Sequence, residues 1–333
     1  EEYAVKKKNI LLILMTLFAV CFISGCKQNV GTPEDNAVVE ETENDEDETG
    51  GHVYGFSGAD LSDPFYEVLK ESVSSMVEEE ESRMLVRDAG GDSGLQNTQI
   101  QELIHEGVEA VFLCPADPVA VTPALEALHE ADIPVINLYV RTESADLAKA
   151  FIGADDYNAG KVCGEDLISR QPEGGSLVIV DRPESPAINE RITGFEEAVA
   201  GGGFEVERID VGDDYGLIAG QLKAVMREKP QIKAIMCGDD HMAKQVLDTL
   251  KEEDRDDILV YSVGGSPEIK NALADLSSPM TGVGAVSPIN MGKTAAKTAA
   301  AILEGGVYEQ ETYTETFYIS KENVNMYGTD GWQ

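Results

Sequence analysis

The sequence predicts an α/β protein with two similar lobes, each built on a parallel sheet, joined by a hinge of several strands. From residue 52 onward, short apolar runs alternate with amphipathic segments, which is the order that produces parallel sheets. The same pattern returns after about 123–125 residues in three pairs of segments. A chain of 333 residues is also longer than one compact domain usually requires.

The first half supplies one complete lobe. A short apolar run at 53–57 leads through a polar turn into a helix that carries Phe65 and Tyr66, the opening unit of a parallel sheet. An amphipathic helix is predicted at 94–107, with Leu95, Ile100, Leu103 and Ile104 on one face. The predicted strands are 53–57, 83–88, 110–114, 133–138 and 149–153.

The second half repeats this order. The segments 176–195, 234–240 and 258–263 correspond to the opening unit, to 110–117 and to 133–138. A helix at 289–304 and a late strand at 315–319 follow, too little for a third domain, so we expect them to cross back and complete the lobes. The predicted lobes are therefore 52–154 with 287–314, and 155–286 with 315–330, and their strand ends meet at a shared cleft.

The N-terminal segment predicts export. Three lysines at 6–8 precede an apolar run at 10–23, which is short for a membrane span, and the small residues Ser24 and Gly25 precede Cys26. The ending resembles a bacterial lipobox, in which the cysteine is lipidated, although an uncleaved membrane anchor is the alternative. We expect a signal peptide at 1–26, an acidic flexible tether at 27–51, and a lipid-anchored body in the periplasm or on the outer face of the cell membrane.

Composition excludes several classes of function. The net charge of −37 argues against nucleic-acid binding. Cys114, Cys163 and Cys237 are odd in number and two lie in apolar runs, so we expect small buried hydrophobic residues and no disulfide framework. The histidines lack zinc-hydrolase spacing, and there is no phosphate-binding glycine loop followed by lysine. We therefore expect no enzyme activity, cofactor or metal site.

Residues 52–328 resemble the periplasmic sugar-binding proteins of ABC transporters, the ribose-binding type in particular. Each motif is weak alone, but together they keep the order of the family. The matching pieces are 55–57 with 61–66, 107–117, 133–135, 152–156 with 159–160, 190–195 and 239–243. The resemblance implies the type 1 periplasmic-binding fold and a monomer that captures a sugar by hinge closure and delivers it to a permease. A receptor that presents its closed form to a sensor kinase or chemoreceptor is the alternative.

The resemblance also implies a ligand site. Its expected residues are Asp63, Phe65, Tyr66, Tyr139, Arg141, Arg191 and Asp239. Aromatic rings cover the apolar face of a sugar, while carboxylates and a guanidinium bind its hydroxyls. The two aspartates are also candidates for helix N-caps, and the aromatic pair for core residues.

Three polar ligands of the ribose binders are absent or displaced. The chain has Leu138–Arg141, Val263–Gly265 and Val286 at these positions. We interpret Tyr139 as a second aromatic face and Gly264 as a change that enlarges the pocket. The resulting hypothesis is a larger or less hydroxyl-rich ligand than ribose, such as a hexose, a pyranoside or a modified sugar.

Overall fold

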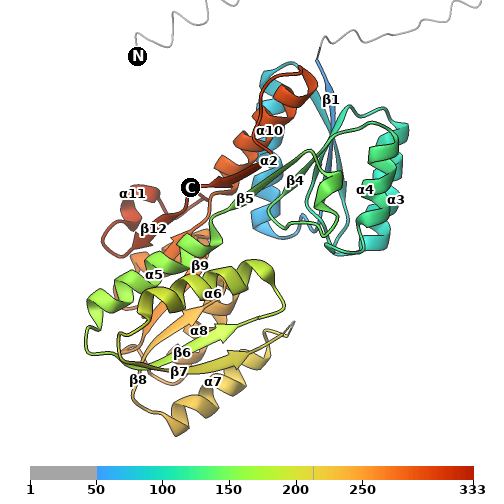
Figure 1. Cartoon of the computed structure of the whole chain (residues 1–333). Helices are drawn as coiled ribbons and strands as arrows, with labels where there is room; N and C mark the ends of the chain where they lie inside the picture. Colours follow the sequence, from blue (N-terminus) through green and yellow to red (C-terminus); the bar gives the residue numbers. More distant parts are fainter. Residues whose placement is uncertain (1–50, 213) are drawn as a thin grey trace, which may run out of the picture. The chain divides into compact units, whose positions relative to one another are not determined.

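The computed structural model describes residues 51–212 and 214–333, which form two six-stranded sheets with flanking helices (Figure 1). The predicted signal peptide, and nearly all of the predicted acidic tether, lie outside the described residues. Within the described ranges, no helix has both the length and the apolar character needed to cross a membrane. The predicted α/β class is confirmed.

The first sheet has the strand order β11-β5-β4-β3-β1-β2, and all of its pairs are parallel. The ends of its strands β1 to β5 lie within about two residues of the predicted positions. The bounds are β1 Val53–Gly58, β2 Arg83–Asp88, β3 Ala110–Leu113, β4 Val135–Leu138, β5 Ala150–Ala154 and β11 Glu311–Thr314. Its helices are α2 Pro64–Glu79, α3 Ser93–His105, α4 Thr122–Glu130 and α10 Pro288–Leu303, with a short 3-10 turn η1 at Ala145–Leu147.

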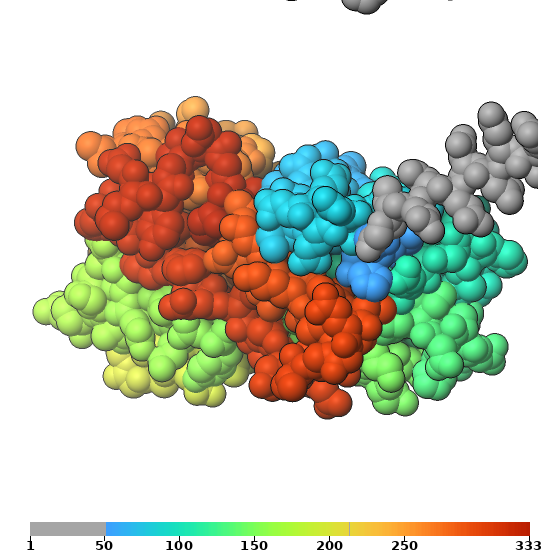
Figure 2. All heavy atoms as spheres, turned by 90° about the horizontal axis from the view of Figure 1, so that it is seen from above, coloured from blue at the N-terminus to red at the C-terminus, as the bar shows by residue number. Residues whose placement is uncertain are grey.

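Helices cover both faces of this sheet. Along β3, Ala110 and Phe112 pack with α2 and α10, whereas Val111 and Leu113 pack with α3 and α4. Alternate residues of a strand point to opposite faces, so a strand buried on both sides is apolar throughout. Figure 2 shows the orange surface of α10 beside the blue surface of α2, which it contacts although the two are distant in sequence.

The prediction that Leu95 lies on the apolar face of α3 is wrong. Ile100 and Leu103 of α3 are buried, but Leu95 is 45% exposed. The inward position near the start of α3 is taken by Gln96, which is fully buried and bonds Ser57 and the carbonyl of Cys114. A polar side chain can occupy this core position because its amide is hydrogen-bonded.

The second sheet repeats the order of the first, as β12-β10-β9-β8-β6-β7. Its strands are β6 Gly175–Asp181, β7 Phe204–Asp210, β8 Ile232–Cys237, β9 Leu259–Gly264, β10 Met280–Ala285 and β12 Phe317–Ser320, the last antiparallel to β10. Its helices are α5 Asp156–Arg170, α6 Pro186–Val199, α7 Leu217–Glu228, α8 Asp240–Glu252, α9 Pro267–Ala274 and α11 Val324–Tyr327. The cysteines Cys114, Cys163 and Cys237 are free and buried, as predicted.

The chain passes between the two sheets three times within the described residues. The passages lie between β5 and α5, between β10 and α10, and between β11 and β12. The expected single late strand at 315–319 is therefore wrong in detail. It is replaced by β11, which pairs with β5, and β12, which pairs with β10, with Glu315 and Thr316 between them.

Helices α5 and α6 approach each other closely because glycines face the contact. A Cβ atom at Gly160 would lie 1.8 Å from the carbonyl oxygen of Arg191, and one at Gly194 would lie 2.0 Å from that of Tyr157. Both neighbours are backbone atoms, so a side chain here displaces a whole helix. This close packing holds the start of α6, and with it Arg191, against the passage from β5 to α5.

We predict that Gly160→Ala lowers the free energy of unfolding by about 2 kcal/mol or more, because overpacking a rigid contact is destabilising. Gly220→Ala, at an exposed position of helix α7, is the matched control, since no atom lies within 4 Å of the added Cβ. That control should raise stability by about 0.5–1 kcal/mol through helix propensity alone. Urea denaturation measures both, and equal effects of the two changes would contradict this account of the α5–α6 contact.

Candidate functional site

A cavity of about 510 Å³ lies at the carboxyl ends of strands from both sheets. In each sheet the chain order reverses at one point, between β1 and β3 and between β6 and β8, which is where α/β sheets bind ligands. Six of the seven predicted site residues line the cavity: Asp63, Phe65, Tyr66, Tyr139, Arg191 and Asp239. The other lining residues include Arg182, Tyr215, Asp240, His241, Val263, Gly264, Ser266, Glu268, Val286 and Trp332.

The turn after β1 positions an acid and an aromatic pair. Asp63 is the N-cap of α2, and its Oδ1 accepts a hydrogen bond of 2.8 Å from the backbone N–H of Phe65. This bond fixes the first turn, so that Phe65 and Tyr66 both reach the cavity. Phe65 also belongs to the apolar core, at 8% exposure, so the core and lining roles coincide in one residue.

Tyr139 follows β4 in a strained backbone conformation. Its φ angle is +62°, and the N–H of Val140 donates to the carbonyl of Leu138 across it, which closes a tight three-residue turn. Its ring centroid lies 4.3 Å from that of Phe65, so the two rings form one continuous aromatic wall. Non-glycine residues adopt this conformation rarely, and such strain is concentrated at functional sites.

Arg191 connects the second lobe to the hinge and to the first lobe. Its Nε donates to Asp156 Oδ1 at 2.7 Å, one terminal nitrogen donates to the carbonyl of Gly238 at 3.0 Å, and the other donates to the Tyr139 hydroxyl at 2.9 Å. Burial opposes the charge of Arg191, but the Asp156 carboxylate and the Tyr139 hydroxyl raise its pKa overall. A guanidinium has five N–H groups, so these bonds leave two for a ligand.

The end of β8 contributes two aspartates with different roles. Asp239 is the N-cap of α8, bonded to the N–H of Met242 at 2.8 Å, and its other oxygen accepts from the Tyr215 hydroxyl at 2.7 Å. Asp240 is held by Ser262 Oγ and by the N–H groups of Gly265 and Ser266. Both helix-capping alternatives for Asp63 and Asp239 are thus confirmed, and each residue still lines the cavity.

Burial raises the pKa of Asp240, because the hydrogen bonds from Ser266 and Ser262 only partly compensate for lost solvation. A Cβ atom at Gly264 would lie 2.5 Å from the Asp240 carboxyl carbon, and Gly264 has a φ of +151°. This glycine therefore makes room for the carboxylate of Asp240. Gly264 also lines the cavity, and the interpretation that it enlarges the pocket stays a prediction.

Arg141 is the predicted residue that the structure does not bring to the cavity. Its guanidinium pairs with Glu311 at 2.9 Å and bonds the Tyr313 hydroxyl at 3.0 Å. It also lies 4.0 Å from the ring centroid of Phe151. These partners belong to β5 and β11, so Arg141 braces the edge of the first sheet.

Sequence reasoning missed Trp332 and Tyr215. Tyr215 lies in the loop after β7, and Trp332 lies after α11, so neither occupies a repeated position in the two lobes. Trp332 packs edge-on against Phe65 with ring centroids 5.5 Å apart. The one available signal was that Trp332 is the only tryptophan of the chain.

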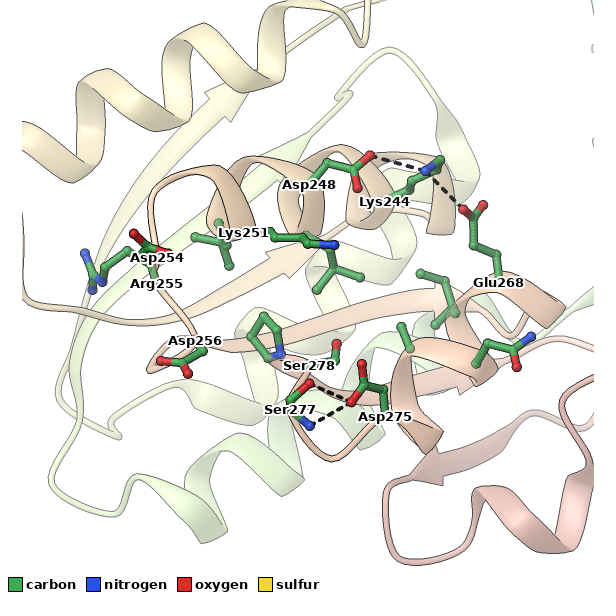
Figure 3. Close-up of a pocket in the computed structure, with 16 residues that line it drawn as sticks. Lys244, Asp248, Lys251, Asp254, Arg255, Asp256, Glu268, Asp275, Ser277 and Ser278 are labelled. Carbon is green, nitrogen blue, oxygen red and sulfur yellow. Dashed lines mark hydrogen bonds and ion pairs between the residues drawn. The ribbon is translucent and has the colours of Figure 1, made fainter.

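A second cavity, of about 560 Å³, lies on the second lobe beside α8 and α9. Figure 3 shows Lys244 between Asp248 and Glu268, and Asp275 turned toward Ser277. These charged and polar groups satisfy one another, and apart from the shared Glu268 none belongs to the cavity between the lobes. In the described ranges, no group of histidine, cysteine and acidic residues could hold a metal ion.

Two similar lobes, three passages between them and a cavity lined from both sides define a hinged, two-lobed binding protein of α/β class. The profile of the periplasmic binding protein domain family matches residues 54–306. The chain belongs to this family. Membership assigns it a binding function rather than a catalytic one, and a location outside the cytoplasm.

Curated relatives and solved structures agree with this assignment. The chain is 25% identical over 256 residues to the ribose import binding protein of Bacillus subtilis (strain 168), covering 75% of this chain and 81% of the relative. It is also 25% identical to the Escherichia coli (strain K12) ribose import binding protein, covering 74% of this chain and 82% of the relative. A Mycobacterium smegmatis ABC transporter solute-binding protein with bound glycerol is 26% identical, with a TM-score of 0.76 over 85% of this chain and 99% of that one.

The raised pKa of Asp240 predicts a pH dependence. In the unfolded chain this carboxyl titrates near its ordinary value of 3.8, and in the folded protein it titrates higher. Its contribution to stability is therefore complete below the unfolded pKa and is lost as the pH rises through the folded pKa.

Asp240→Asn removes this titration. We expect the free energy of unfolding of the wild type, minus that of the variant, to decrease as the pH rises above about 4. Urea denaturation over this pH series measures it. A difference that stays constant, or grows with pH, would contradict the raised pKa.

Proposed function

We propose that this protein captures a sugar between its lobes and delivers it to the permease of an ABC transporter. The observation that carries the proposal is that aromatic rings and charged groups from both lobes line one cavity. One lobe contributes Asp63 and the aromatic wall of Phe65 and Tyr139, and the other contributes Arg191 and Asp239. The ribose import binding proteins among the relatives support the same class of ligand.

A sugar fits this arrangement chemically. The C–H groups on one face of a sugar ring are apolar and pack on aromatic rings, while its hydroxyls both donate and accept hydrogen bonds. Arg191 has two N–H groups left for acceptor oxygens, and charge-assisted bonds of this kind are strong. A mostly apolar pocket with a few fixed polar groups is the usual form of a small-molecule site.

The apolar lining favours a ligand with fewer hydroxyl contacts than ribose makes in its own binders. Gly264 and Val286 line the cavity at positions where the ribose-binding type carries polar ligands. Neither residue has a polar side chain, so neither position offers a side-chain partner to a ligand hydroxyl that loses its bonds to water. A hexose or a modified sugar with an apolar substituent beside Val286 suits the cavity better.

Closure would couple capture to delivery. The bond between Arg191 and Tyr139 joins residues of the two lobes, and both residues line the cavity. A ligand that bonds Arg191 and packs on the aromatic wall would stabilise the closed arrangement, because it contacts both lobes only there. A permease that recognises the closed arrangement would then receive only loaded protein.

A sugar panel tests the proposal. We expect a hexose or a modified sugar to stabilise the protein more than D-ribose does. At 100 times its dissociation constant, the gain should be about 2.7 kcal/mol, measured as a thermal shift. Fluorescence provides an independent readout because the single tryptophan, Trp332, lines the cavity. A response to amino acids or nucleosides and to no sugar would refute the sugar assignment, and tight binding of ribose alone would refute the hexose preference.

Two arginine variants locate the site. Arg191→Lys keeps a positive charge beside Asp156 but loses the planar fork, and we expect the affinity for the stabilising sugar to fall about 10-fold or more. Arg141→Ala is the matched control, because Arg141 pairs with Glu311 away from the cavity, and it should leave the affinity unchanged. Calorimetry measures both. The opposite result would move the site away from this cavity.

The lipid anchor is a further part of the proposal and rests on the sequence alone. Cys26 follows the apolar run and two small residues, and it lies outside the described residues. We expect Cys26→Ser to move the protein from the membrane fraction to the soluble fraction of a bacterial host that lipidates such signals. Cell fractionation with immunoblotting measures this, and Cys21→Ser is the matched control. Membrane retention of the Cys26 variant would argue for an uncleaved anchor instead.

A further inference from the structure

The segment Gly328–Gln333, which follows α11, returns to the cavity. It runs along α9, where Asn271 Nδ2 donates to the carbonyl of Thr329 at 3.1 Å. At its end, Gln333 Nε2 donates to the carbonyl of Val286 at 2.9 Å, and the Ser287 hydroxyl donates to the carbonyl of Gln333. The segment is therefore tied to the second lobe and to the passage between β10 and α10. The label C in Figure 1 marks its last residue.

We propose that Trp332, carried by this segment, is a ligand-contacting residue that sets specificity: its indole ring forms a wall of the cavity and its Nε1–H donates a hydrogen bond to the ligand. The inference deepens the proposed function and rests on it, because it assigns a new contact to the same cavity. No repeated motif of the two lobes contains this residue, so it was not among the expected site residues.

The first support is the position of the ring. Trp332 lines the cavity, and its ring meets that of Phe65 at an angle of 81°, with centroids 5.5 Å apart. Phe65 belongs to the first lobe, whereas the segment that carries Trp332 is anchored to α9 of the second lobe and to the passage that follows β10. The indole thus extends the aromatic wall of Phe65 and Tyr139 at a right angle, which makes a corner instead of a flat face.

The second support is an unused donor. Trp332 Nε1 is buried and has no hydrogen-bond partner within the described part of the chain. Indole nitrogens normally find a partner when buried, because a lost hydrogen bond to water is otherwise uncompensated. No water-sized group reaches this nitrogen in the structure, so a ligand oxygen satisfies it when binding shifts the ring or its segment. The ligand should therefore carry an acceptor, a hydroxyl or ring oxygen, beside the edge that packs in the aromatic corner.

The third support is the attachment of the segment. Lys270 of α9 is fully buried and its Nζ has no hydrogen-bond partner among the described residues. Burial lowers the pKa of Lys270, and the Asp330 carboxylate, in the same segment as Trp332, partly offsets this. The Asp330 carboxylate thus favours the charged form of Lys270, while the bonds to Asn271, Val286 and Ser287 hold the segment.

Calorimetry on full-length wild type, Trp332→Phe and Trp332→Ala tests the inference. The probe is the tightest binder found in a thermal-shift panel of D-ribose, D-allose, D-galactose, xylitol, amino acids and nucleosides. Trp332→Phe keeps a ring but removes the donor, and we expect about 3- to 10-fold weaker binding. Trp332→Ala also removes the wall and should weaken binding by about 30-fold or more.

Tyr313→Phe is the matched aromatic control. It removes a hydroxyl that bonds Arg141 away from the cavity, and it should leave affinity unchanged. Affinities of both Trp332 variants within about 2-fold of the wild type would overturn the inference. Tighter binding by Trp332→Ala would also overturn it, since the indole would then occupy the place of the ligand.

The outcomes also separate this inference from the proposed function. If the tightest probe is an amino acid or nucleoside, the sugar function fails, yet the same three proteins still measure the role of Trp332 with that probe. If a sugar binds and the Trp332 variants match the wild type, the function stands and the Trp332 contact fails.

Discussion

The hydrogen bonds of one buried guanidinium organise the space between the lobes. Arg191 is 3% exposed, and it bonds the hinge through Asp156, the end of β8 through Gly238, and the first lobe through Tyr139. Loss of one partner of a buried ion pair costs about 3–5 kcal/mol, because the other charge is left uncompensated. The close glycine contact between α5 and α6 serves this arrangement, since it brings the α6 arginine within reach of the α5 aspartate. A ligand therefore meets a donor whose position is already fixed, which reduces the entropy lost on binding.

The residue of the first lobe that accepts a hydrogen bond from Arg191 is Tyr139, which has a strained backbone conformation. The positive φ of Tyr139 turns its side chain out of β4, so that its ring lies on Phe65 and its hydroxyl meets Arg191. A conformation of this kind costs on the order of 1–3 kcal/mol and persists because the surroundings compensate for it. Here the ring contact and the interlobe bond are the compensation. Opening of the lobes would break that bond, so the strain of Tyr139 is linked to closure.

The cavity combines the chemistry of a carbohydrate site with valine side chains and aromatic rings. Three of its carboxylates are held in place by hydrogen bonds from the protein. Asp63 and Asp239 cap α2 and α8, and Asp240 accepts bonds from three donors of the β9–α9 region. A capping bond uses one carboxylate oxygen and fixes the direction of the other. Gly264 and Val286 stand where polar groups are expected from the ribose-binding type, so neither position supplies a polar side chain to the cavity. Phe65 and Trp332 form two walls of the cavity that meet at about a right angle, and these walls restrict the shape of the space.

The sequence by itself determined the architecture and six of the residues that line the cavity. Strand and helix periodicity is local, and the repeat of about 124 residues implied two equal sheets, so the ends of β1, β4, β6 and β8 could be predicted to meet. Tertiary structure decided what depends on contacts between distant segments. Arg141 pairs with Glu311, which is 170 residues away in the sequence. Gln96, and not Leu95, occupies the buried position near the start of α3. Trp332 packs against Phe65, although the two are distant in the sequence. None of these has a periodic signal, because each side chain takes the partner that the folded backbone brings within reach.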